Sequence, residues 1–324
     1  MKKRITAKKF VLVLVALVCT ASLVAGIHQL TFTSGGSSTK GYYKEIAIGC
    51  QLPEVPTDVP RLEVVYRDVR PDEITRIANE VFNLSGIVGE LPHHDFLENG
   101  GDTGLYVENT GVGGVLLYRS GAIEYGTGER WSQAMDYVPN LPSYEKAREI
   151  AEDFMQKIET HGLVPENIDW QFLGVFPAEG IAIGGTNIVR YLGVSFNLTY
   201  GGREINGAKV LVTIAENDRI IGFKATWKRI KEEEGRTTVT VTPGKAFEKF
   251  KSGTSLAGLA APPFTEKAVV KDVKLVYFSK IDPNELEDHL QVAYRLAIVP
   301  INENGVEGSQ YLDWVSATDN PLVI

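Results

Sequence analysis

The chain has few of the residue patterns that mark enzymes or disulfide-stapled proteins. It contains only 2 cysteines, and Cys50 is the only one beyond the N-terminal apolar run, so no disulfide can form within the rest of the chain. No H-E-x-x-H, G-x-S-x-G or phosphate-loop motif occurs among its histidines, serines and glycines. The sequence signatures of zinc proteases, serine hydrolases and P-loop NTPases are therefore missing.

Basic charge is also scarce. The sequence has 33 lysines and arginines against 41 aspartates and glutamates, which gives a net charge of -8. Binding to a nucleic-acid backbone needs a concentrated basic surface. We therefore expect no nucleic acid among the partners of this protein.

Only one long apolar run is present, Phe10–Ile27, and it carries neither charge nor proline. As a helix it would rise about 27 Å, close to the roughly 30 Å hydrocarbon core of a bilayer. The basic residues of segment 1–9 predict a cytoplasmic N-terminus. We expect a single-pass cell membrane protein that contacts the membrane through a transmembrane signal-anchor, residues 10–27, and has its C-terminal body outside. Cleavage of this run as a signal peptide, which would release a secreted body, stays open.

Turn-forming residues divide the remainder of the chain. Residues 28–60 are rich in glycine, serine and proline, and we interpret them as a flexible stalk. After the stalk, the pattern passes three times from a helix to strands. This predicts three small modules over residues 61–140, 141–232 and 233–324.

Each predicted module begins with an amphipathic helix. Pro71 opens the first helix at a position where a missing N–H costs nothing. Ser143 caps the second helix, and Thr242 followed by Pro243 begins the third. Apolar residues recur at helical spacing after each start, so every helix has one face to bury.

Between the helices, apolar residues alternate with polar ones, which is typical of half-buried strands. The predicted strands are 192–198, 210–214, 220–227, 273–278, 292–299 and 311–317. The first three are separated by turn residues, and they predict an antiparallel meander that packs on the second helix. The predicted fold class is α+β: serial small modules, each a helix packed on an antiparallel β-meander, behind one N-terminal membrane helix.

Two stretches of this pattern resemble a known group of regulators. Segment 194–227 resembles the extracytoplasmic modules of the PepSY and YycH/YycI group, in which a strand, a turn and two further strands follow a helix. The segment from TPGKAFEKF at Thr242 through VKLVYF to YLDWVSATDN is similar to the C-terminal YycH/YycI module. The resemblance covers mainly residues 142–324 and, more faintly, residues 61–125. It implies a protein that binds and regulates a membrane or envelope partner such as a sensor kinase, with no catalytic, cofactor-binding or metal residue to carry over.

His93, His94 and Asp95 form the one dense cluster of metal-ligand residue types. Adjacent residues rarely bind the same ion, and no helical spacing accompanies them. We interpret the cluster as a solvated polar loop and expect neither a metal nor another cofactor.

Two charged stretches have similar interpretations. Glu285, Glu287 and Asp288 lack the residue order of a calcium loop, so we expect a solvated face. The run Lys228–Arg236 is interpreted as an exposed linker between modules.

The sequence therefore predicts a regulatory, protein-binding function without catalysis. One alternative is a peptidase-inhibitor or propeptide-like module that acts on an envelope protease. A further alternative is a metal-dependent envelope hydrolase that uses His93, His94 and Asp95. The glycosylation-type triplets at Asn83 and Asn197 do not decide among these functions.

Overall fold

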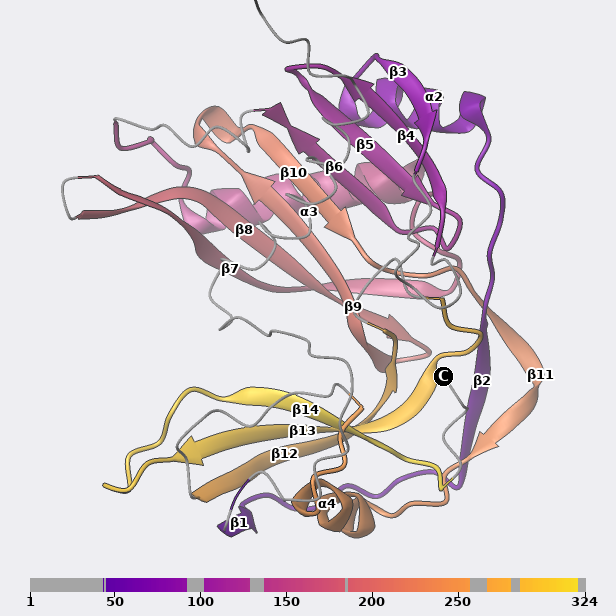
Figure 1. The fold of residues 1–324 in the computed structure, drawn as a ribbon, viewed down its shortest axis with the longest axis vertical. Helices are drawn as coiled ribbons and strands as arrows, with labels where there is room; N and C mark the ends of the chain where they lie inside the picture. The colour runs from indigo at the N-terminus through magenta and orange to yellow at the C-terminus, as the bar shows by residue number, and fades with distance from the viewer. Residues whose placement is uncertain are drawn as a thin grey trace, which may run out of the picture.

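A computed structural model describes residues 43, 45–91, 102–128, 137–183, 186–256, 267–280 and 286–319. Strands predominate in this part of the chain (Figure 1). The strands are β1 (Glu45–Ile48), β2 (Asp58–Val64), β3 (Ile87–Glu90), β4 (Gly104–Asn109), β5 (Gly113–Tyr118), β6 (Ile123–Thr127), β7 (Ile168–Ile183), β8 (Thr186–Tyr200), β9 (Arg203–Ile214), β10 (Ile220–Ala225), β11 (Ile230–Thr238), β12 (Lys267–Phe278), β13 (Gln291–Ile301) and β14 (Tyr311–Ser316). The α-helices are α2 (Pro71–Phe82), α3 (Tyr144–Thr160) and α4 (Pro243–Lys251).

Most of these strands belong to one 12-stranded mixed sheet. Its main path runs β14-β13-β12-β9-β10-β6-β5-β4-β3, while the β7–β8 hairpin joins the other side of β9 and β1 pairs in parallel with β12. Strands β2 and β11 form a separate two-stranded ribbon, at the right of Figure 1.

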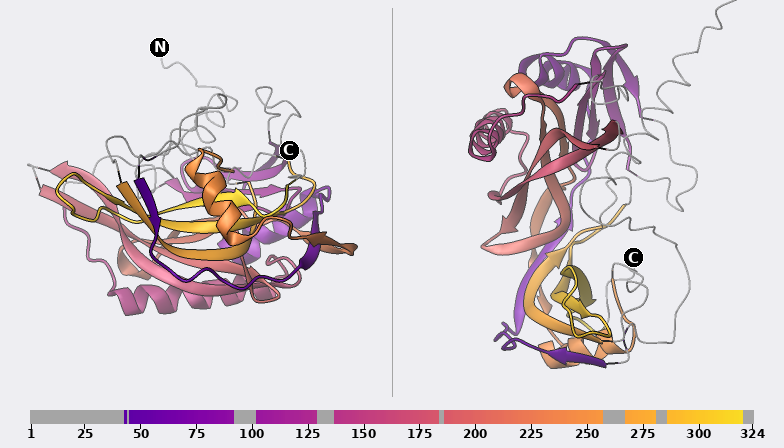
Figure 2. Two further views of the ribbon diagram at one scale, coloured as in Figure 1. Left: turned by 90° about the horizontal axis from the view of Figure 1, so that it is seen from below. Right: turned by 90° about the vertical axis from the view of Figure 1, so that its left-hand side faces the viewer.

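Two lobes can be distinguished along the sheet. The large lobe, in the upper part of Figure 1, contains β3 to β10 with α2 and α3. The small lobe, in the lower part, contains β1 and β12 to β14 with α4. Strand β9 of the large lobe pairs with β12 of the small lobe, and Figure 2 shows the two lobes from two further directions.

The three helices begin where the sequence places them. Helix α2 has Pro71 at its start, and Asn83 ends it in the left-handed conformation with φ 52°. Ser143 Oγ accepts the N–H of Lys146 over 3.1 Å at the start of α3. Thr242 Oγ1 accepts from an α4 amide in the same way. These side chains satisfy amides that the first turn of a helix leaves unpaired.

All three helices contribute to one hydrophobic core. Ile77 of α2, Met155 of α3 and Phe250 of α4 are buried in a single cluster. Val212 of the large lobe and Tyr294 of the small lobe belong to the same cluster. The core therefore continues from one lobe to the other.

The predicted fold class of serial helix-on-meander modules is wrong. The strands at 192–198, 210–214 and 220–225 do form an antiparallel meander. However, β10 also pairs with β6 of the first predicted module, where Phe223 lies opposite Tyr125. Strands from all three predicted modules thus join one sheet, and parallel pairs at β12 make it mixed. The module boundaries at 140 and 232 stay predictions.

The predicted membrane topology also needs correction. Each helix in the described ranges is too short or too polar for a membrane span. The longest, α3, has 17 residues and carries charged side chains along its exposed face. The expected span at residues 10–27 lies outside the described residues. We therefore withdraw the prediction of a single-pass membrane protein with a signal-anchor and an external body.

Candidate functional site at the junction of two lobes

The two lobes meet at a bulge in β9. On one side, β9 pairs with β8. Leu198 of β8 lies opposite Ile205, but Phe196, two residues before it, lies opposite Val210, so the register shifts between these two pairs. On the other side, the first half of β9 pairs with β12 and the second half pairs with β10. Residues 206–209 occupy the extra length of the bulge. The bulge thus allows the single strand β9 to pair with strands of both lobes.

Gly207 is required at this bulge. Its backbone φ angle is +90°, a value that residues other than glycine rarely adopt. A Cβ atom here would lie 1.8 Å from the carbonyl oxygen of Ser279, which belongs to the small lobe. The absence of a side chain therefore allows the two backbones to approach each other.

Polar contacts fix the small lobe to the same bulge. The N–H of Ser279 donates to the carbonyl of Asn206 over 2.8 Å. Trp314 Nε1 donates to the Asn206 side-chain oxygen over 3.0 Å, and its ring packs against Phe278 with centroids 5.3 Å apart. Asn206 is thereby held by both its backbone and its side chain.

A buried ion pair spans the junction beside the bulge. Lys228, between β10 and β11, lies 2.7 Å from Glu287, between β12 and β13, and their side chains are 1% and 6% exposed. Desolvation of two charges costs several kcal/mol per ion, so such a pair needs further hydrogen bonds. Ser279 Oγ donates to Glu287 Oε1 over 2.5 Å, and the N–H of Lys280 donates to Oε2 over 3.2 Å.

Tyr66 completes the surroundings of Glu287. Its hydroxyl accepts from the Glu287 N–H over 2.9 Å and donates to the Glu287 carbonyl over 3.2 Å. Burial raises the pKa of this hydroxyl, so Tyr66 stays neutral. The residue follows β2 and therefore links the β2–β11 ribbon to the small lobe.

A second carboxyl group, that of Asp102, lies near the cationic end of the pair. Asp102 is 2% exposed and accepts the N–H of Ser120 over 3.1 Å, while its Oδ1 has no hydrogen-bond partner. Burial raises the pKa of Asp102, although its hydrogen bonds and the positive charge of Lys228 act in the opposite direction. Asp102 therefore adds a second buried carboxyl group to this part of the interior.

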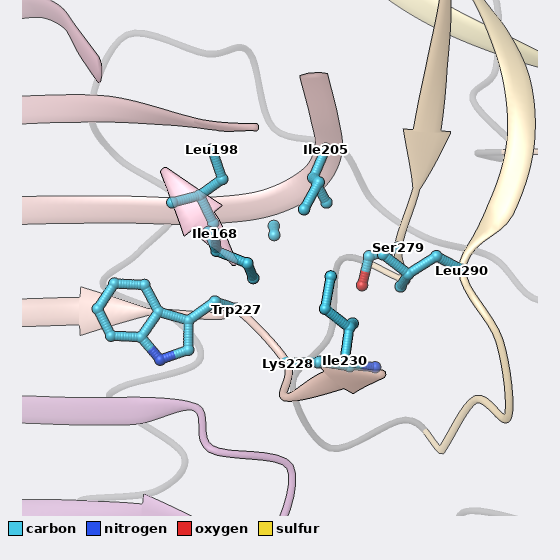
Figure 3. Close-up of a pocket in the computed structure, with 9 residues that line it drawn as sticks. Ile168, Leu198, Ile205, Trp227, Lys228, Ile230, Ser279 and Leu290 are labelled. Atoms are coloured by element: carbon cyan, nitrogen blue, oxygen red, sulfur yellow. The ribbon is translucent and has the colours of Figure 1, made fainter. Parts of the chain in front are cut away.

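A small apolar cavity adjoins the ion pair (Figure 3). It has room for no more than about one water molecule, far below the several hundred Å³ of a typical ligand pocket. The cavity is lined by Ile168, Leu198, Ile205, Ala208, Trp227, Lys228, Ile230, Ser279 and Leu290. These residues come from both lobes and from the ribbon, so the cavity is a packing gap where the three parts meet.

The chemistry of this cluster is structural. A nucleophile or general base must reach a substrate, whereas Lys228 is enclosed in its ion pair and the Ser279 hydroxyl is bound to Glu287. The neighbouring cavity cannot hold a substrate. The arrangement acts as a closed joint that fixes two parts of the molecule against each other.

Two charged stretches differ from their sequence interpretation. The run Lys228–Arg236 is exposed only in part, because Lys228 is buried, whereas most of residues 231–236 are exposed and belong to β11 on the ribbon. Within it, Glu233 pairs with Arg61 over 2.8 Å. Glu287 is not on a solvated face, because it is the buried partner of Lys228. The sequence carries no local signal for this pair, since a lysine before a charged run usually faces solvent.

The predicted metal-ligand cluster is not placed by the structure. His93, His94 and Asp95 lie outside the described residues, as does Glu285. Within the described ranges, no group of three histidine, cysteine or acidic residues is arranged to hold a metal ion. Cys50 is a free, half-buried thiol.

Comparisons with known proteins do not place this chain in a family. No protein-family model matches the sequence, and no curated protein matches it.

Proposed function

We propose that this chain is a regulatory binding protein that acts on another protein and catalyses no reaction of its own. The observation that carries the proposal is the closed junction. Its charged and hydroxyl groups are engaged in internal contacts, and the cavity beside them fits about one water molecule. The most concentrated buried polar chemistry of the described residues therefore stabilises the scaffold, and the outer surface is left for function.

The resemblance of residues 142–324 to YycH/YycI-type regulators supports a particular partner class. On this basis the partner is a membrane or envelope protein, with a sensor kinase as the leading candidate. The alternative is an envelope protease inhibited by a propeptide-like module. The hydrolase alternative would need His93, His94 and Asp95, which the described residues do not include.

Addition of a partner strand is disfavoured at the edges of β7, β11 and β3. Strand β7 pairs only with β8 among the described strands, but Pro177 and several register shifts interrupt its outer edge. Strand β11 has a bulge between Glu232 and Arg236, and β3 is only 4 residues long. These features protect the edges of β7, β11 and β3 from further pairing, whereas β14 forms the opposite end of the sheet path.

Four of the five apolar side chains that are more than half exposed provide sites for probing such binding. Ile87, Val138, Leu173 and Val306 are 78%, 75%, 58% and 59% exposed, respectively. They lie on separate segments of the chain, and single exposed apolar residues are common. They therefore do not define a patch, but each can carry a photocrosslinker without disturbing the core.

The test is photocrosslinking in the native host with a benzoylphenylalanine at each of these four positions. Each variant without irradiation serves as its own matched control. We expect at least one surface position to give a discrete crosslinked protein, and the purified pair to bind directly. A change in kinase autophosphorylation would support the leading partner class, and loss of peptidase activity would support the alternative. Turnover of a substrate by the purified chain alone, without a crosslinked partner, would overturn the proposal.

A further inference from the structure

The backbone connection between the two lobes is narrow. Within the described residues, β9 and β12 share only the parallel pairs Ile205–Tyr277 and Asn206–Phe278. The β2–β11 ribbon provides a second connection beside them (Figure 1). Units joined by a small interface move relative to each other unless specific contacts hold them.

Each connection contains a local irregularity at which the angle can change. In β9 this is the bulge at 206–209 with Gly207 in the left-handed region. In β11 the register with β2 shifts between Glu232 and Arg236. Bulges bend strands and interrupt the regular ladder, so bending is easiest at these points.

Apolar packing at the junction does not by itself fix the angle. The core passes from one lobe to the other here, but the side chains of Ile205, Ile230 and Leu290 border a cavity and do not interdigitate fully. Apolar contact is non-directional, whereas a hydrogen-bonded ion pair is satisfied in one geometry only. The Lys228–Glu287 pair has that directional character, with Ser279, Lys280 and Tyr66 also holding Glu287.

We infer that the Lys228–Glu287 pair is a latch that sets the angle between the two lobes. With the latch closed, the small lobe is held against the β9 bulge in one orientation. When the pair is broken, the lobes remain folded and connected through the contacts of Asn206 and the Arg295–Glu204 pair, but they sample a wider range of angles around the two bulges. A buried ion pair contributes little net stability against an apolar substitute, so its retention here is explained by this orienting role. The latch does not depend on the proposed partner.

The test measures the angle directly through the distance between two spin labels. One label is placed on α3 with Asp153→Cys and the other on the small lobe with Glu303→Cys, both exposed positions. The full chain is used, with Cys19 and Cys50 replaced by serine. We expect one narrow distance distribution for this parent, and at least a doubling of its width or a shifted mean in Lys228→Met and Glu287→Gln.

The matched control is Lys146→Met, which breaks the exposed pair with Glu149 on α3. It should leave the distance distribution of the parent unchanged. Circular dichroism and thermal melts on each labelled variant establish that it is folded. A folded Glu287→Gln variant with the parent distribution would overturn the latch. So would loss of all folded protein in both single variants, because the pair would then be a stability element only.

Discussion

Lys228 Nζ and Glu287 Oε1 lie 2.7 Å apart in the interior, and they come from segments on opposite sides of the lobe junction. Removal of one partner leaves the other charge buried without compensation. We predict that Lys228→Met and Glu287→Gln each lower the free energy of unfolding by about 3 to 5 kcal/mol. The double variant that combines Lys228→Met with Glu287→Gln should cost clearly less than the sum of the single changes.

Urea unfolding of the four proteins in this cycle measures the coupling. The exposed pair Lys146–Glu149, with atoms 3.3 Å apart, provides the comparison and should contribute less than about 1 kcal/mol. Equal, small effects at both pairs would mean that Lys228 and Glu287 are hydrated in solution.

Gly207 should be the least tolerant of the turn and bulge glycines. Gly207→Ala places a Cβ against the Ser279 carbonyl as well as forcing alanine into the left-handed region. We expect a loss of about 3 to 5 kcal/mol, the sum of backbone strain and overpacking. Gly202→Ala is the control, because φ there is +75° with nothing within 4 Å, and it should cost only about 1 to 2 kcal/mol. Similar denaturant midpoints for the two variants would contradict the close approach at the bulge.

Asp313 should make stability fall as pH rises. Burial raises its pKa from 3.8 in the unfolded chain to about 7 in the fold, although hydrogen bonds from Ser255 and the Trp314 amide act against this. Between these two values the folded protein keeps a proton that the unfolded chain releases. The stabilisation that Asp313 provides is therefore complete below pH 3.8. It is lost as the pH rises from 3.8 to about 7, by about 1.4 kcal/mol per pH unit.

The measurement compares Asp313→Asn with the parent across that window. The asparagine stays neutral, so the variant should gain stability relative to the parent as pH increases from about 4 to about 7. Urea midpoints that change in parallel for the two proteins would show that the Asp313 carboxyl group titrates normally.

Trp227 should be more sensitive to substitution than Trp170. It is fully buried, lines the junction cavity, and donates from Nε1 to the Gly121 carbonyl over 3.0 Å. Trp227→Phe enlarges the cavity and leaves that carbonyl unpaired, for an expected loss of about 2 to 4 kcal/mol. Trp170, which is half-buried against the core and donates to Glu159, is the comparison site, and Trp170→Phe should cost clearly less than Trp227→Phe. Equal losses in thermal unfolding would count against tight packing at the junction.

The helices and strands themselves were predictable, because the residues that indicate them lie within or next to each segment. The Ser143 cap, the Thr242 and Pro243 start, and the alternation at 192–198 each depend on neighbouring residues, and each predicted element is present. Caps and periodicity report how a segment buries its own face. They do not report which distant strand lies next to it.

The sheet and the junction depend on such distant pairings. Phe223 beside Tyr125 and Ile205 beside Tyr277 join parts of the chain that the sequence pattern presents as separate modules. The Asn206–Gly207 dipeptide has turn chemistry, yet it forms a bulge inside β9 because β12 packs against it. Lys228 begins a charged run, and only its tertiary partner Glu287 explains its burial.

We propose that the junction is a closed structural joint and not a site open to solvent and substrate. Native-state hydrogen exchange tests it at the amides of Ser279 and Leu290, which donate to Asn206 and Leu62 across the junction over 2.8 and 2.9 Å. We predict that both exchange as slowly as the core amide of Val212, and that Glu287→Gln accelerates them while Val212 stays slow. Rapid exchange of Ser279 and Leu290 in the unmodified protein would contradict the claim, because water would then enter the junction without unfolding.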